Sequence, residues 1–177
     1  MISLLTCYDA AGENADPGDI PADAEAVLYP IDGIYRWTPE TLARFPKAVQ
    51  IPYTVEGNPD AYMFDLESGC CSPAEVARGL EQRRARSLAS LVYCSVDFWG
   101  AYLDDLEGAG LVGPPSHWWV ASYQKEAKPA PTELPTLGKR FRAVAFQYFS
   151  CETFDVSVID VSTFPKNLGT DAVRTGA

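Results

Sequence analysis

Two carboxylates spaced two residues apart, Asp65 and Glu67, are the side chains in this sequence best placed to do chemistry. They end a short apolar run, 61–66, and Ser68-Gly69 follows, a break typical of a strand end. Alternate residues of a strand point to the same face, with Cα atoms about 6.6 Å apart. Carboxyl groups held that close shift one another's pKa, which gives one acid and one base or stabiliser, as glycoside hydrolysis requires. Taken alone, the pair fits solvated residues at a loop entrance better than a catalytic pair.

The composition predicts one globular domain that binds neither nucleic acid nor an anionic membrane. The chain has 177 residues, of which 47% are hydrophobic and 21% charged, enough to bury a single core. The net charge of -10 argues against polyanionic partners. No apolar run approaches the roughly 20 residues of a membrane span. We expect a domain over residues 1–164 and a polar tail over 165–177.

The N-terminus and the cysteines indicate a protein made in a cytoplasm without a bound metal. The first nine residues lack a basic region and have too short an apolar core for a signal peptide. Five cysteines and one histidine, His117, match no zinc spacing, so we expect no metal and no cofactor.

Strand-like and helix-like segments alternate along the chain. Three helices are predicted, over 38–45, 72–87 and 95–107; Thr38 and Ser72 are their first two N-caps, and Glu75 completes a capping box with Ser72. Eight strands are predicted, over 2–8, 26–29, 48–55, 61–66, 88–94, 117–123, 142–149 and 154–161. This alternation predicts parallel pairing in an α/β fold. The chain is shorter than the ~250 residues typical of a (β/α)8 barrel, so we expect a TIM-like barrel, reduced or flattened, with some helices missing.

In such a barrel the C-terminal ends of the strands form the active-site mouth. The residues that fall there are Asp9, Asp32, Asp65, Glu67, Tyr93, Tyr123 and Tyr148, with Asp155 near the start of the last strand. Carboxylates and aromatic rings together suit a sugar-binding cleft, because rings stack on the apolar faces of pyranoses. Asp32 precedes Gly33, which favours a turn role for this carboxylate.

Six short motifs follow one another at the strands: Thr6-Cys7-Tyr8-Asp9, Phe64-Asp65-Leu66-Glu67, Val92-Tyr93-Cys94-Ser95, Trp118-Trp119-Val120-Ala121-Ser122-Tyr123, Phe146-Gln147-Tyr148 and Phe154-Asp155-Val156-Ser157. In this order and spacing, from about residue 3 to residue 161, the sequence resembles the lysozymes of glycoside hydrolase family 25. It is especially similar to the short glycoside-hydrolase-like domains of actinobacterial phages.

The resemblance implies a muramidase, which cleaves the β-1,4 bond between N-acetylmuramic acid and N-acetylglucosamine in peptidoglycan. Glu67 is then the general acid, and Asp65 stabilises charge on the reacting sugar or orients its 2-acetamido group. Asp9 and Asp155 complete the acidic cluster. The residues implied to line the sugar subsites are Tyr93, Trp119, Tyr123 and Gln147.

Three aromatic positions leave alternatives open. Neighbours on a strand alternate, so only one of Trp118 and Trp119 can reach the mouth. Tyr35 and Trp37, just before the helix cap, form either a stacking platform for substrate or ordinary packing.

Two of the six motifs depart from the family pattern. Active members usually carry Asp-x-Ser at the first motif, where this chain has Asp9-Ala10-Ala11, and Asp-x-Asn or Asp-x-Asp where it has Asp155-Val156-Ser157. The second hypothesis is therefore a non-catalytic barrel, kept as a virion decoration or tail component or as a glycan-binding module. A third is an enzyme acting on another polysaccharide. The expected partners are peptidoglycan or another glycan and phage structural proteins, with the protein either virion-associated or released to the cell wall.

Overall fold

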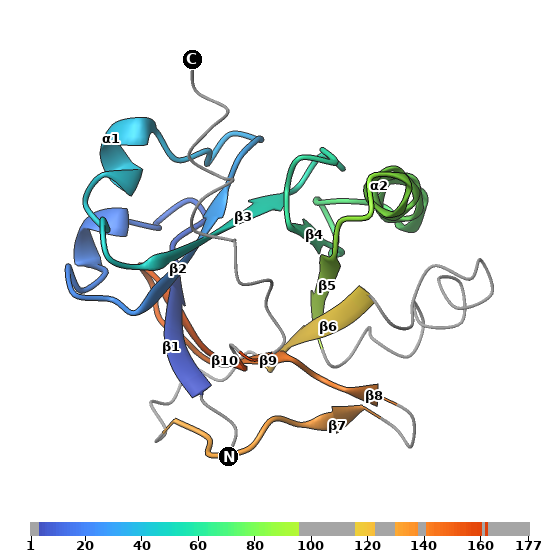
Figure 1. The fold of residues 1–177 in the computed structure, drawn as a ribbon. Helices are drawn as coiled ribbons and strands as arrows, with labels where there is room; N and C mark the ends of the chain where they lie inside the picture. Colours follow the sequence, from blue (N-terminus) through green and yellow to red (C-terminus); the bar gives the residue numbers. More distant parts are fainter. Residues whose placement is uncertain (1–3, 96–115, 123–129, 138–140, 161, 163–177) are drawn as a thin grey trace.

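Eight strands close into a barrel in the computed structural model, which describes residues 4–95, 116–122, 130–137, 141–160 and 162 (Figure 1). The order around the barrel is β1-β10-β9-β6-β5-β4-β3-β2. The strands are β1 (Leu4–Asp9), β2 (Ala26–Pro30), β3 (Val49–Thr54), β4 (Met63–Asp65), β5 (Ser90–Ser95), β6 (Ser116–Ala121), β9 (Ala145–Ser150) and β10 (Asp155–Asp160). Each lies within or beside a predicted strand, so the eight-strand prediction is confirmed.

The last strand runs against the other seven, and the expectation of parallel pairing is wrong for it. β10 pairs antiparallel with both β1 and β9, whereas the other barrel pairs are parallel. Only residues 151–154 separate β9 from β10, and the Cys151 amide donates to the Phe154 carbonyl at 3.1 Å. A parallel crossover needs a dozen or more residues, so this connection can only be a hairpin.

Few helices surround the described part of the barrel. A 3-10 turn, η1 (Pro17–Asp19), lies between β1 and β2, α1 (Pro39–Leu42) between β2 and β3, and α2 (Pro73–Ala85) between β4 and β5. Thr38 caps α1, and Ser72 with Glu75 forms the predicted capping box of α2. α1 is only four residues long because Pro46 follows soon after it. The helix predicted over 95–107 lies almost entirely outside the described residues.

The predicted strand over 142–149 is divided in two. A short two-stranded sheet pairs β7 (Thr136–Leu137) with β8 (Phe141–Arg142), and the barrel strand β9 starts three residues later. The predicted tail, 165–177, also lies outside the described residues. In the part of the chain that the structure describes, no helix is long and apolar enough to cross a bilayer.

Side-chain alternation divides the core between the inside and the outside of the barrel. Met63, Tyr93 and Trp119 belong to the interior cluster, whereas Phe64 and Trp118 pack in the layer between the strands and α2. The choice that the sequence left open between the two tryptophans is thus decided: Trp119 points inward and Trp118 outward.

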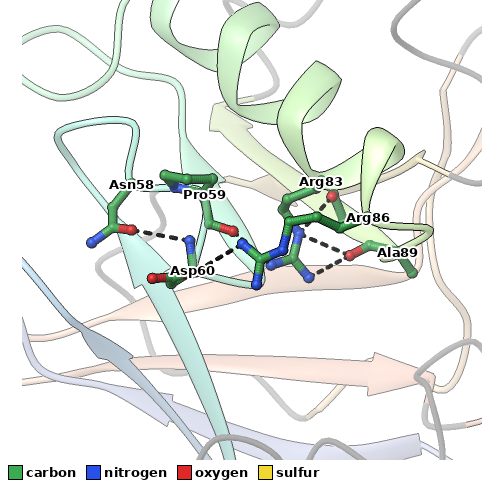
Figure 2. Close-up of polar contacts among 7 residues, drawn as sticks. Asn58, Pro59, Asp60, Arg83, Arg86 and Ala89 are labelled. Carbon is green, nitrogen blue, oxygen red and sulfur yellow. Dashed lines mark hydrogen bonds and ion pairs between the residues drawn. The ribbon is translucent and has the colours of Figure 1, made fainter. Parts of the chain in front are cut away.

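Arg83 fastens the end of α2 to the segments that flank β4 and β5 (Figure 2). Its guanidinium donates to the Ala89 carbonyl at 2.7 Å and to the Pro59 carbonyl at 3.0 Å, although the side chain is only 6% exposed. It also lies 5.7 Å from the ring centre of Tyr62, and burial lowers its pKa to about 10. Arg86 adds an exposed ion pair with Asp60 at 2.8 Å. This network fixes the start of β4, whose other end carries Asp65.

Candidate active site

An acidic cavity of about 540 Å³ opens at the end of the barrel where the parallel strands terminate. Its volume lies within the range of small-ligand sites. The aromatic side chains that line it are Tyr35, Tyr53 and Tyr93, and the carboxylates are Asp9, Asp32, Glu56, Asp65, Glu67 and Asp155. No Lys, Arg or His is found among the described residues of its wall.

Asp65 and Glu67 both face this cavity, as strand alternation predicted, while Phe64 and Leu66 pack on the opposite side. The chain turns sharply after them. The Cys70 amide donates to the Glu67 carbonyl at 3.1 Å, and the Cys71 amide donates to the Asp65 carbonyl at 2.9 Å. Gly69 has φ +88°, a conformation that favours glycine, so the Ser68-Gly69 break permits this turn.

The surroundings of Asp65 shift the pKa of its carboxyl far from the ordinary value. Burial, reinforced by the negative charge of Glu67, raises the pKa of Asp65 to about 7, and a hydrogen bond from the Cys70 thiol opposes the shift. Its Oδ1 atom is buried without a hydrogen-bond partner among the described residues. The negative charge of Glu67 acts on the ionisation of Asp65, so the two carboxyl groups are electrostatically coupled.

Asp9 and Asp155 form a second carboxyl pair on the opposite wall. They are register partners in the β1–β10 ladder. Burial, followed by the charges of Asp155 and Asp65, raises the pKa of Asp9 well above its ordinary value. Burial also raises the pKa of Asp155, against hydrogen bonds from Ser150 and Gln147. Asp9 Oδ1 is a second buried oxygen with no hydrogen-bond partner in the described structure.

Asp32 lines the cavity and also holds the rim loop in place through hydrogen bonds. Its carboxylate accepts hydrogen bonds from Thr54 Oγ1 at 2.6 Å and from the Val55 amide at 2.9 Å. Gly33 has φ +75°, and a Cβ there would collide with the Val55 side chain. The turn role predicted for Asp32 is thus confirmed, although the residue also lines the cavity.

The predicted aromatic residues divide into cavity residues and supporting residues. Tyr35 is 43% exposed at the rim, and Tyr93 lines the wall, where its hydroxyl donates to Gln147 Oε1 at 2.7 Å. Gln147 itself is buried behind Tyr93 and does not line the cavity. Tyr123 lies outside the described residues.

Neither predicted tryptophan reaches the cavity. Trp119 is buried inside the barrel and donates from Nε1 to Ser157 Oγ at 3.2 Å. Trp37 packs against Tyr29 and Phe45 and donates from Nε1 to the Ala10 carbonyl at 3.0 Å. Of the two alternatives, Trp37 is therefore a packing residue and not a stacking platform for substrate. Trp119 belongs to the cluster inside the barrel and Trp37 to a separate packed cluster, and neither lines the cavity.

The cavity residues that sequence reasoning missed include Tyr53, Glu56, Cys70 and Ile34. Tyr53 sits among the carboxylates, and burial together with the charges of Asp9 and Asp65 raises the pKa of its phenol well above the usual value. Its position near the end of the predicted strand over 48–55 was the available signal. Ile34 is 89% exposed at the rim, which only the folded loop could reveal.

The arrangement suits proton transfer and the stabilisation of positive charge. It combines Asp65, a carboxyl that titrates near neutral pH, with further carboxyl groups on the facing wall. Within the described residues, no group of three or more His, Cys, Asp or Glu side chains is arranged to hold a metal ion.

No protein-family model matches the chain, and no curated protein matches it. Function must therefore be inferred from the chemistry of the cavity.

Proposed function

We propose that this protein is a glycoside hydrolase of the muramidase type that cleaves peptidoglycan. The observation that carries the proposal is the convergence of Asp65, Glu67, Asp9 and Asp155 on one cavity, with tyrosines in its wall. Oxocarbenium-like positive charge develops on the sugar during glycoside cleavage, and carboxylates are the groups that stabilise it.

Glu67 is the proposed general acid. It lies beyond the end of β4, is partly exposed and lines the cavity, where a bound glycan can reach it. The Glu67 carboxyl gives its proton to the leaving oxygen as the bond from that oxygen to the anomeric carbon breaks. The 2-acetamido oxygen bonds to the same carbon, and Asp65 stabilises the cation formed. Water then attacks the anomeric carbon, displaces the acetamido oxygen and returns a proton to Glu67.

The proposed architecture is a reduced (β/α)8 barrel in which most helices have been replaced by loops. It is supported by the seven parallel strands and by the position of the cavity at their C-terminal ends. The fold by itself does not select the activity, because barrels host many unrelated functions.

The experiment compares the native protein with Glu67→Gln on purified actinobacterial peptidoglycan, following turbidity and released reducing sugar. Glu81→Gln, on the exposed face of α2, is the matched control. We expect the Glu67 variant to lose at least 100-fold in rate and the control to keep the native rate. Absence of sugar release by the native protein from every wall type and pH tried would refute the hydrolase.

The second candidate is a non-catalytic barrel that binds glycan, as a virion component or a binding module. One observation favours it. Ala10 is buried and Ala11 lines the cavity, so the two residues that follow Asp9 supply no hydroxyl beside it. Glycan binding that persists in Glu67→Gln, without any sugar release by the native protein, would support this candidate.

A further inference from the structure

A smaller pocket of about 200 Å³ continues the cavity past Asp155. The two share Ala11, Gly12 and Asp155 in their walls, so they meet at a common border. The side pocket lies between the loop after β1 and the β9–β10 hairpin. Its polar wall includes Glu13, Asn14, Ser150 and Glu152, of which Glu13, Asn14 and Glu152 are exposed. Together the cavity and the side pocket form one cleft.

The charge of this cleft has a single sign. The side pocket adds Glu13 and Glu152 to the six carboxylates of the cavity, and no described residue of either wall is basic. A cleft lined by one sign of charge focuses the field and concentrates ligands of the opposite sign. Polysaccharides rich in carboxylates are therefore disfavoured, and cationic ones are favoured.

Two buried carboxylate oxygens in the cavity wall lack a hydrogen-bond donor among the described residues. Asp9 Oδ1 and Asp65 Oδ1 lie in the cavity wall, buried and without a partner among the described residues. Buried polar atoms are normally paired, so a ligand that donates hydrogen bonds and carries positive charge would complete the site. An ammonium group supplies both the positive charge and the hydrogen-bond donors that these oxygens can accept.

We propose that the cleft binds a glycan strand containing positively charged, N-deacetylated glucosamine units, with one ammonium group held at Asp155 between the cavity and the side pocket. The inference rests on the proposed glycan-cleaving function and specifies its substrate class. The muramic acid that reacts keeps its acetamido group, and the free amine belongs to a neighbouring glucosamine. An ammonium group beside Asp9 and Asp155 also relieves the repulsion between their carboxylates.

The test measures binding of two tetrasaccharides to the Glu67→Gln protein by calorimetry at about pH 6. One is a glucosamine tetramer, with protonated amines, and the other is its fully N-acetylated, neutral counterpart. We expect the cationic tetramer to bind at least ten-fold more tightly at low salt and the difference to shrink in about 0.5 M NaCl. Glu13→Gln and Glu152→Gln, each combined with Glu67→Gln, should reduce the preference about two- to five-fold. Glu81→Gln, combined in the same way, should leave it unchanged.

Equal binding of the two tetramers, tighter binding of the neutral one, or no binding of either would overturn the inference. Hydrolysis by the native protein is measured separately on peptidoglycan before and after chemical re-acetylation of its amines. Cleavage that is indifferent to re-acetylation refutes the inference and leaves the muramidase proposal intact. Preferential binding of the cationic tetramer, with no cleavage of any wall, refutes the muramidase instead and keeps the cationic glycan as the ligand.

Discussion

Asp9 and Asp155 are direct partners across the antiparallel β1–β10 ladder, although 145 positions lie between them in the sequence. Asp9 ends its strand and Asp155 begins its own, so the reversed direction of β10 brings both carboxyl groups to the cavity. If β10 ran parallel to the other strands, its first residue would lie at the opposite end of the barrel. The hairpin between β9 and β10 therefore completes the acidic wall.

Replacing Asp155 with Asn should lower the pKa of Asp9. The charge of Asp155 contributes to the raised pKa of Asp9, but burial is the larger cause, so the value should remain above that of an exposed aspartate. Carboxyl NMR titration of the native protein and the variant measures the shift. Asp19→Asn, on the exposed η1 turn, should leave Asp9 unchanged. An unchanged or higher Asp9 pKa in Asp155→Asn would show that the two carboxyl groups are not electrostatically coupled.

Asp65→Asn should stabilise the protein at pH 8 and not at pH 3. The folded pKa of Asp65 is about 7, above the unfolded value near 4, so the folded state holds a proton that the unfolded state releases between these values. The carboxyl therefore costs stability progressively as pH rises from about 4 to about 7. The gain in the free energy of unfolding should be on the order of 1 to 4 kcal/mol above pH 7. Denaturant unfolding at both pH values tests this; a gain that is the same at each would exclude a titrating Asp65 as its source.

Gly79→Ala should damage the site through the packing of α2 on β4. A Cβ at Gly79 would overlap the ring of Phe64, the residue before Asp65. Alanine favours helix by about 1 kcal/mol, but overpacking typically costs about 1 to 3 kcal/mol, so we expect a net loss of stability. The double variant with Phe64→Leu, which lacks the clashing ring atoms, should recover part of the loss. Thermal unfolding measures both, and a more stable Gly79→Ala would contradict the close contact.

Arg83→Met should destabilise the fold by about 2 to 4 kcal/mol. The variant keeps an apolar stem but leaves the Ala89 and Pro59 carbonyls without their charged donor (Figure 2). The Ser90 hydroxyl loses the same donor. Arg78→Met, at an exposed position of the same helix, should change the free energy of unfolding by less than about 0.5 kcal/mol. Similar effects of the two substitutions in urea unfolding would mean that the Arg83 network contributes no specific stability.

The local features of this protein could be predicted from the sequence because they depend on neighbouring residues. The Ser72–Glu75 capping box, the eight strands and the shared face of Asp65 and Glu67 follow from residue spacing alone. Strand alternation also predicted that only one of Trp118 and Trp119 could point into the barrel.

Only the tertiary structure decided which distant residues meet and how deeply they are buried. Strand pairing placed Asp155 opposite Asp9, and the closed barrel buried Trp119 and Gln147 beneath the cavity instead of exposing them in it. Burial, rather than residue type, raises the pKa of Asp65 to about 7. The sequence by itself determined which side chains are available for chemistry. The fold determined which of them share a cavity, because contacts between remote strands and the loss of solvent arise only when the barrel closes.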